Sequence, residues 1–169
     1  MEAEAVMYTV GILTISDKGS AGLRTDESGP RIKELLPKEQ YRVTEYEIVP
    51  DEKEAISRAL CRLCDEAGCN LVLTTGGTGF AKRDVTPEAT LAVMEKNAPG
   101  IAEALRAYSF QFTKRAVLSR GMSVIRGNSL IINLPGSTKA VTESMEFLLG
   151  TIEHGLDILL ARDGECGRQ

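Results

Sequence analysis

The sequence contains a single histidine, His154, among its 169 residues. Catalytic arrangements of the Ser-His-Asp or Cys-His kind need a histidine beside the nucleophile, and this chain has little with which to build one. His154 also falls on the face of a predicted helix near the end of the chain. We therefore interpret His154 as a structural residue and expect no catalysis of this kind.

Cysteine is scarce as well, with four copies at Cys61, Cys64, Cys69 and Cys166. Cys61 and Cys64 form a C-x-x-C pair, which can indicate a metal site or a redox centre. A tetrahedral zinc site needs four ligands, however, and Cys166 lies in a polar tail. A redox pair is typical of a helix start, where the helix dipole lowers a thiol pKa. Cys61 and Cys64 instead fall well inside a predicted helix, so we predict that they are small core residues.

The sequence has neither a basic cluster nor a long apolar run. Its net charge of −4 argues against a broad nucleic-acid surface, because such binding is driven by clustered cations that displace counterions. No apolar run approaches the roughly 18 residues of a transmembrane helix. The first residues, Met1–Glu4, are acidic where a secretory signal would be basic. We expect a cytoplasmic protein without nucleic-acid or membrane partners, in which local cations bind a small anion.

The composition, 43% hydrophobic and 26% charged, is that of one globular domain large enough to bury a core. We place this domain at residues 1–162 and interpret residues 163–169 as a polar C-terminal tail. Near-continuous apolar runs predict strands at residues 8–15 and 70–74, and a third strand is predicted at 41–49, which stops at Pro50-Asp51. Two further β-rich runs, 123–126 and 129–133, are separated by Gly127-Asn128 and predict a hairpin.

Apolar residues at helical spacing predict helices between these strands, at residues 30–36, 51–67, 87–96, 99–112, 137–149 and 152–160. Ser137 is the expected N-cap of the helix that follows it. Strands that are apolar throughout are typical of a sheet covered on both faces. The order of elements therefore predicts a three-layer α/β fold, in which helices flank a mainly parallel sheet with one hairpin.

A glycine-rich loop, Gly76–Asp84, is the most informative stretch of the chain. It lies between the predicted strand 70–74 and a helix start, where Thr86 is the expected N-cap and Pro87 the first helical residue. Glycines let successive amides approach anionic oxygens. The loop is neither a Walker A motif nor a dinucleotide fingerprint, because Phe80-Ala81 and Lys82 occupy the diagnostic positions. It therefore predicts a phosphate site of another kind.

Four polar loops follow predicted strands, at residues 16–26, 50–51, 76–84 and 133–139. The carboxyl ends of parallel strands meet at one edge of a sheet, which is where open α/β folds bind ligands. We therefore expect these loops to come together and line one cleft.

Asp51 and Asp84 are candidate Mg²⁺ ligands, because magnesium prefers hard oxygen ligands at the rim of a phosphate site. Each residue has another interpretation. Asp51 fits an N-cap that forms a capping box with Glu54. Asp84 fits a partner of Arg83 or a cap of the helix at Thr86.

Three other charged residues also have two interpretations. Lys82 and Arg83 are either surface cations or groups that neutralise phosphate charge. Asp26 either contacts a ligand or only helps to start the first helix. The residue types alone leave both possibilities open.

Five motifs follow one another along the chain, namely Ser16-Asp17, Asp26–Pro30, Pro50–Glu52, Thr75–Phe80 with Arg83–Thr90, and Leu134–Gly136. Taken together, they resemble the molybdopterin adenylyltransferases, the MogA-type enzymes of molybdenum cofactor synthesis. The likeness extends over nearly the whole chain and includes the G domain of gephyrin and of its plant counterpart.

The resemblance implies that molybdopterin and Mg²⁺-ATP bind in adjoining pockets and that AMP passes to molybdopterin with release of pyrophosphate. It implies that Asp51 and Asp84 are catalytic residues that position the magnesium ion. The other residues that it associates with substrate binding are Asp26, Gly76, Gly77, Thr78, Gly79, Lys82, Arg83, Ser109, Asn133, Pro135, Gly136 and Ser137. Among these, Thr78 and the amides of the three loop glycines are expected to cradle phosphates.

The resemblance also implies a homotrimer. Gephyrin and its plant counterpart carry a second domain that inserts molybdate, and this chain is too short to hold one, so we expect a separate molybdate-inserting enzyme as a partner. Two alternatives stay open. The protein is a non-catalytic molybdopterin carrier or assembly scaffold, or it is a MoaB-type homologue that shares these loops.

Overall fold

The computed structural model describes residues 7–162 of the chain. The acidic residues Met1–Glu4, the predicted tail 163–169 and Cys166 lie outside the described residues.

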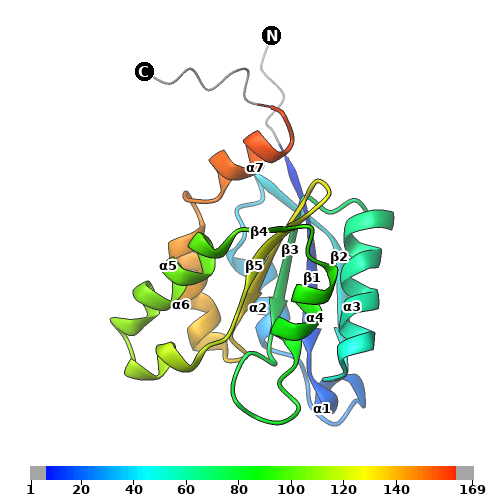
Figure 1. The fold of residues 1–169 in the computed structure, drawn as a ribbon, viewed down its shortest axis with the longest axis vertical. Coiled ribbons are helices and arrows are strands. Elements are labelled where there is room, and N and C mark those ends of the chain that lie inside the picture. Colours follow the sequence, from blue (N-terminus) through cyan, green and yellow to red (C-terminus); the bar gives the residue numbers. More distant parts are fainter. Residues whose placement is uncertain (1–6, 163–169) are drawn as a thin grey trace.

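One mixed sheet forms the centre of the molecule (Figure 1). Its strands are β1 (Tyr8–Ile15), β2 (Tyr41–Val49), β3 (Leu71–Thr75), β4 (Lys96–Asn97), β5 (Ser123–Arg126) and β6 (Ser129–Leu134). They lie side by side in the order β2-β1-β3-β6-β5-β4. The β1, β2, β3 and β6 strands are parallel, while β5 runs antiparallel to both β6 and β4. Arg126 pairs with Ser129, so the predicted hairpin with Gly127-Asn128 at its turn is confirmed.

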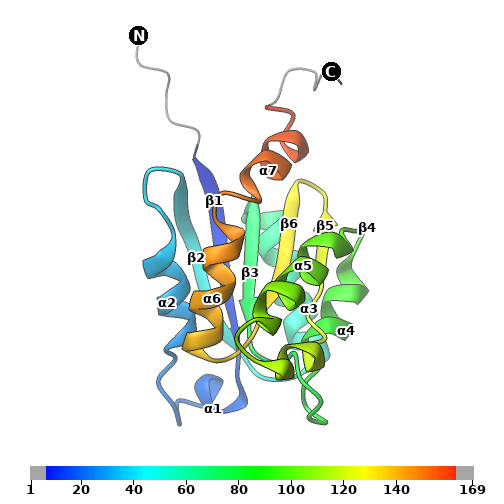
Figure 2. The same ribbon diagram turned by 90° about the vertical axis from the view of Figure 1, so that its left-hand side faces the viewer.

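Helices cover both faces of the sheet, as the sequence predicts. They are α1 (Asp17–Ser20), α2 (Ser28–Leu35), α3 (Lys53–Cys61), α4 (Thr86–Val93), α5 (Pro99–Phe110), α6 (Thr138–Leu148) and α7 (Glu153–Leu159), with a π-helical turn η1 (Arg62–Glu66) and a 3₁₀ turn η2 (Lys114–Leu118). Figure 2 shows α2, α6 and α5 in front of the sheet, with α3 and α4 behind it. The three-layer α/β architecture is therefore confirmed.

The hydrophobic core has two parts, one on each face of the sheet. Ile32, Leu105 and Met145 bring α2, α5 and α6 onto one face. Ile56 and Ala89 bring α3 and α4 onto the other. Since β1 and β3 are buried along nearly their whole length, their near-continuous apolar runs have the expected cause, whereas the edge strand β2 is mostly exposed or half-buried.

Some local predictions were wrong. The helix predicted at 87–96 ends at Val93, because Met94 is extended and Lys96–Asn97 then pairs with β5 as an edge strand. Residues 17–20, predicted as loop, form the short helix α1, because the Ser16 hydroxyl accepts a hydrogen bond from the Gly19 amide.

The cysteine prediction is confirmed for the thiols that the structure describes. Cys64 and Cys69 are buried, Cys61 is partly buried, and all three are free thiols. Burial raises the pKa of Cys64 to about 11, as expected of an inert core thiol. Within residues 7–162, no helix is both long and apolar enough to cross a membrane.

Candidate functional site

The carboxyl ends of the parallel strands bring the predicted polar loops to one edge of the sheet. The loops after β1 and β2 exchange hydrogen bonds, from the Asp51 amide to Asp17 Oδ1 (3.0 Å) and from the Asp17 amide to Asp51 Oδ2 (2.9 Å). The Gly76 amide donates to the carbonyl of Leu134 (3.2 Å), which joins the loops after β3 and β6. Figure 1 shows the glycine loop at the same end of the molecule as α1, opposite α7. The predicted convergence is confirmed.

Three of the four loops, those after β1, β3 and β6, line one cleft, and the loop after β2 does not. A cleft of about 620 Å³ lies between the loops after β1, β3 and β6, with Asp26, Gly76, Gly136 and Ser137 in its lining. A smaller, mostly apolar cavity of about 180 Å³ lies between α5, η2 and α6. Ser109, Asn133 and Pro135 belong to its lining. The two cavities are neighbours along the segment that leads from β6 into α6. The two predicted metal ligands, Asp51 and Asp84, line neither of these two cavities.

The Asp51 carboxylate joins the loops after β1 and β2 and does not cap α3. The α3 helix begins at Lys53, and its N-cap Glu52 makes no side-chain capping bond, so the predicted capping box with Glu54 is wrong. The competing partner is the Asp17 amide, which occupies Asp51 Oδ2. Burial raises the pKa of Asp51, and the negative charges of Asp17 and Asp84 act in the same direction. Burial and the neighbouring carboxylates therefore disfavour the charged form of Asp51.

Asp84 turns back into its own loop. Its Oδ2 atom accepts a hydrogen bond from the Ala81 amide (3.0 Å), while the Asp84 amide donates to the Ala81 carbonyl (3.0 Å). The two simpler interpretations of Asp84 are both wrong. Arg83 pairs with Asp17 instead, and α4 begins after Val85 without a side-chain cap.

Arg83 crosses from the glycine loop to the loop after β1. Its guanidinium donates to both carboxylate oxygens of Asp17, at 2.5 and 2.9 Å. This hydrogen bonding lowers the pKa of Asp17. Lys82 is exposed beside Arg83. An anion that recruits Arg83 would have to share it with Asp17 or displace that contact.

The glycine loop passes close to its neighbours. A side chain at Gly76, which has a φ of +99°, would place its Cβ 2.4 Å from the Ile15 carbonyl. The Thr86 hydroxyl donates to the Gly76 carbonyl (2.9 Å), and α4 includes Thr86, so the prediction of Thr86 as an N-cap is wrong. Because Leu134 already uses the Gly76 amide, a phosphate cradle would use the amides of Gly77, Thr78 and Gly79.

Asp26 is surrounded by donors. Its carboxylate accepts hydrogen bonds from the hydroxyls of Thr14 (2.7 Å), Ser28 (3.3 Å) and Tyr46, and from the Gly29 amide (3.3 Å). Burial, followed by this contact with Asp26, raises the pKa of Tyr46 to about 12. Asp26 lines the larger cleft, but these bonds also hold together β1, β2 and the start of α2.

The Asn133 side chain is committed to the fold. Its amide nitrogen donates to the hydroxyls of Thr74 and Thr90, both at 3.0 Å, and its oxygen accepts from the Met122 amide at 3.0 Å. At 5% exposure, little of Asn133 is left for a substrate. Ser137, by contrast, is the predicted N-cap, because its hydroxyl accepts from the Ala140 amide (3.1 Å).

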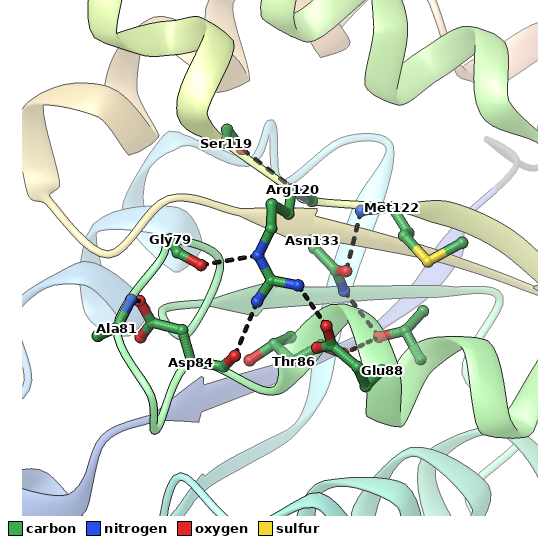
Figure 3. A network of polar contacts seen from close by, with 11 residues as sticks. Gly79, Ala81, Asp84, Thr86, Glu88, Ser119, Arg120, Met122 and Asn133 are labelled. Atoms are coloured by element: carbon green, nitrogen blue, oxygen red, sulfur yellow. Dashed lines mark hydrogen bonds and ion pairs between the residues drawn. The ribbon is translucent and has the colours of Figure 1, made fainter.

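Arg120, which the sequence analysis missed, fills the base of the glycine loop (Figure 3). Its guanidinium donates to the carbonyls of Gly79 (2.8 Å) and Asp84 (2.7 Å) and pairs with Glu88. Its own amide donates to the Thr78 carbonyl (2.9 Å). No local pattern around Arg120 indicates this role, because its partners lie far back in the chain.

Asp51 and Asp84 fit a magnesium ion that is shared with a substrate. Magnesium usually takes one or two carboxylates from a protein and completes its shell with phosphates and water. Burial is the main cause that raises the pKa of Asp51, and the charges of Asp17 and Asp84 add a repulsion that a cation would relieve. Within the described part of the chain, no group of three or more His, Cys, Asp or Glu residues is placed to hold a metal ion. Phosphate oxygens would therefore have to supply further ligands.

Most of the chain is similar to one family of known proteins. Residues 11–154 match the family described as "Probable molybdopterin binding domain". A molybdopterin adenylyltransferase from Helicobacter pylori is 44% identical over 153 residues, which cover 89% of this chain and 87% of that protein. The molybdopterin adenylyltransferase from Escherichia coli K12 is 46% identical over 139 residues, covering 81% of this chain and 71% of that protein.

A solved structure gives the same result. The crystal structure of the molybdopterin biosynthesis enzyme MoaB from Thermus thermophilus has a TM-score of 0.87 and 44% identity, covering 92% of this chain and 98% of that one. With the family match over residues 11–154 and relatives at 44% identity or more over most of its length, the chain belongs to the molybdopterin-binding domain family.

Proposed function

We propose that this protein is a molybdopterin adenylyltransferase, which transfers AMP from ATP to the terminal phosphate of molybdopterin and releases pyrophosphate. The relatives from H. pylori and E. coli carry that name. One observation carries the proposal in this structure, namely the two carboxylates beside the glycine loop. Asp51 Oδ1 lies 3.3 Å from the Cβ position that Gly77 lacks, and Asp84 Oδ2 lies 2.9 Å from that of Gly79.

The reaction forms one P–O bond and breaks another. An oxygen of the terminal phosphate of molybdopterin attacks the α-phosphorus of ATP, and the bond to the departing pyrophosphate breaks. Both reactants are anionic, so the site must neutralise charge and hold the reacting groups in line. A magnesium ion bound by Asp51 and Asp84 would supply Lewis-acid stabilisation of the leaving pyrophosphate.

The protein's own groups have three tasks in this scheme. The amides of Gly77, Thr78 and Gly79 bind phosphate oxygens, because backbone amides of a glycine loop can all point to one anion. The cations of Lys82 and Arg83 add positive charge at the exposed side of the loop. Asp51 and Asp84 would hold a magnesium ion, which would supply positive charge beside the triphosphate.

The two neighbouring cavities are suited to two substrates. The larger cleft receives the start of α6, where Gly136 and Ser137 lie, and a helix N-terminus favours an anionic group. The smaller cavity is mostly apolar and has Ser109 and Pro135 at its wall, as expected of a site for a planar ring. We therefore assign molybdopterin and ATP to this pair of cavities, with their phosphates meeting near the glycine loop.

We also propose an oligomeric state, a partner enzyme and a cellular location for the protein. A homotrimer is supported by exposed apolar side chains on α5, on η2 and on the segment between them, such as Phe110, Phe112 and Val117. A separate molybdate-inserting enzyme would take the adenylylated product, and the cytoplasm is the expected location.

The test is turnover by the purified protein. With molybdopterin, ATP and Mg²⁺ under anaerobic conditions, we expect one pyrophosphate and one adenylylated molybdopterin per reaction, measured by coupled phosphate release and mass spectrometry. Omission of either molybdopterin or Mg²⁺ should abolish the signal. Binding of molybdopterin without any release of pyrophosphate would reject the proposal and favour a carrier or scaffold.

The MoaB-type alternative keeps the support of the Thermus thermophilus structure. It shares the fold and the loops, so the motifs do not separate it from a MogA-type enzyme. The mass of the assembly in solution is the sharper criterion, because the two types are expected to differ mainly in assembly state.

A further inference from the structure

Three chain segments that are distant in sequence meet at Arg120. The residue lies between η2 and β5, on a segment that Arg106 of α5 supports by donating to the Gly121 carbonyl (2.7 Å). Its side chain is only 32% exposed, and its guanidinium reaches across to the loop after β3. Contacts outside the glycine loop therefore fix the backbone segment that carries Arg120.

The contacts of Arg120 pin both arms of that loop. On the first arm, its amide donates to the Thr78 carbonyl (2.9 Å) and its Nε to the Gly79 carbonyl (2.8 Å). On the second arm, its Nη2 atom donates to the Asp84 carbonyl (2.7 Å). Figure 3 shows the guanidinium between the two arms. The tip of the loop stays outside this clamp, where Phe80 is 71% exposed.

Glu88 completes the arrangement from the first turn of α4. Its carboxylate pairs with the Arg120 guanidinium, so the positive charge is neutralised beside the loop. An unpaired guanidinium near Asp84 would compete with a cation for that carboxylate. The pair thus supplies rigid hydrogen-bond donors at little net charge.

We propose that Arg120 is a positioning residue for Asp84, because its planar fork fixes the spacing between the two arms of the glycine loop. The inference rests on the proposed adenylyltransferase function. Arg120 touches no reacting atom in this scheme and acts through the loop. Lysine should replace it poorly, since an ammonium group is a point donor and lacks the rigid fork of a guanidinium.

The first test is a double-mutant cycle on pyrophosphate release. Arg120→Ala should lower kcat about 10- to 100-fold, the range expected when a residue that orients a ligand is lost, with little change in molybdopterin affinity. Asp84→Ala should remove more activity. If Arg120 acts through Asp84, the double variant should lose less than about threefold beyond Asp84→Ala alone. Losses that multiply would overturn the proposal.

The second test does not depend on turnover. Hydrogen exchange followed by mass spectrometry should show faster exchange over residues 78–84 in Arg120→Ala, with α3 unchanged. Arg126→Ala is the matched control, because Arg126 also forks onto a carboxylate and a carbonyl, those of Asp65 and Val93, on the far hairpin. It should leave both kcat and loop exchange unchanged.

Arg120→Lys keeps the test decisive if the alanine variant does not fold. We expect intermediate loop exchange and an intermediate kcat. Loop exchange as slow as in the parent protein, in either variant, would overturn the positioning role. If the parent protein itself releases no pyrophosphate, the proposed function fails, and the exchange result alone decides whether Arg120 holds the loop.

Discussion

At the amino end of the sheet, carboxylates accept hydrogen bonds from tyrosine hydroxyls. At the carboxyl end, the Asp51 carboxylate lies close to two other carboxylates. Under α7, Tyr8 donates to Asp157 (2.6 Å) and Tyr41 donates to Glu153. At the other end, burial raises the pKa of Asp51, and the nearby charges of Asp17 and Asp84 act in the same direction. In the first arrangement the carboxylates accept from neutral hydroxyls, and the buried Glu153 Oε2 atom has no hydrogen-bond partner among the described residues. In the second arrangement Arg83 already pairs with Asp17, and a further cation would stabilise the charged form of Asp51.

This difference distinguishes structural carboxylates from candidate functional ones. A carboxylate oxygen that accepts from hydroxyl and amide donors gains stability from the fold, as Glu153 Oε1 does with the Tyr41 hydroxyl and the Gly150 amide. Asp26 shows that the distinction is not simply one of location. It lines the larger cleft yet accepts hydrogen bonds from Thr14, Ser28, Gly29 and Tyr46, in the manner of the amino end. We therefore expect Asp26 to contribute more to stability than Asp51 or Asp84 does.

The largest effect should follow from removing a carboxylate at the carboxyl end. Asp84→Ala is expected to lower turnover at least about 100-fold, the scale of a lost transition-state contact, while the protein still binds molybdopterin. Asp157→Asn at the amino end is the control, with unchanged turnover and a lower thermal midpoint. Equal turnover in Asp84→Ala and the parent protein would remove the functional side of the comparison.

A second contrast uses glycines at the two ends. Gly76 and Gly150 both have positive φ, at +99° and +85°, but only Gly76 has a backbone carbonyl within 2.4 Å of the Cβ position. Gly150→Ala should lower the free energy of unfolding by about 1–2 kcal/mol, because a left-handed backbone is unfavourable for alanine. Gly76→Ala should cost roughly 3 kcal/mol or more, because a steric clash is added.

Urea denaturation of the two glycine variants measures these costs. Similar free energies of unfolding would show that the glycine loop is less tightly packed against β1 than the structure indicates.

The smallest predicted effect is a pH dependence at the amino end. Burial is the main cause that raises the pKa of Tyr8, to about 12, and that of Tyr41 as well. The unfolded chain ionises these tyrosines near pH 10, before the folded protein does, so stability is present below pH 10 and is lost as pH rises. Each tyrosine can contribute at most about 1.4 kcal/mol per pH unit.

Tyr41→Phe tests this linkage, because it removes one titrating group. The free energy of unfolding, measured from pH 9 to 12, should fall less steeply in the variant than in the parent protein. Parallel curves would show that Tyr41 is not protected from ionisation by its surroundings.

Much of the fold was predictable because its signals are local. Apolar runs, the Gly127-Asn128 turn and the Ser137 cap each depend on a few neighbouring residues, and the structure has all of them. The convergence of the polar loops was also predictable, since it follows from parallel strands alone.

The missed features depend on partners that are distant in the sequence. Asp51 has a good sequence context for an N-cap, but the Asp17 amide competes for its carboxylate. The β4 strand forms only because β5 lies beside it. Arg120 acts on the glycine loop through contacts 36 to 41 residues away, which no short motif reports.

The most direct measurement is a crystal structure with a non-hydrolysable ATP analogue and Mn²⁺, whose anomalous scattering locates the cation. The account predicts one anomalous peak within coordination distance of both Asp51 and Asp84, with phosphate oxygens in the same shell and the amides of Gly77 to Gly79 facing the triphosphate. A triphosphate bound away from the glycine loop, with no metal peak at these two aspartates, would contradict it.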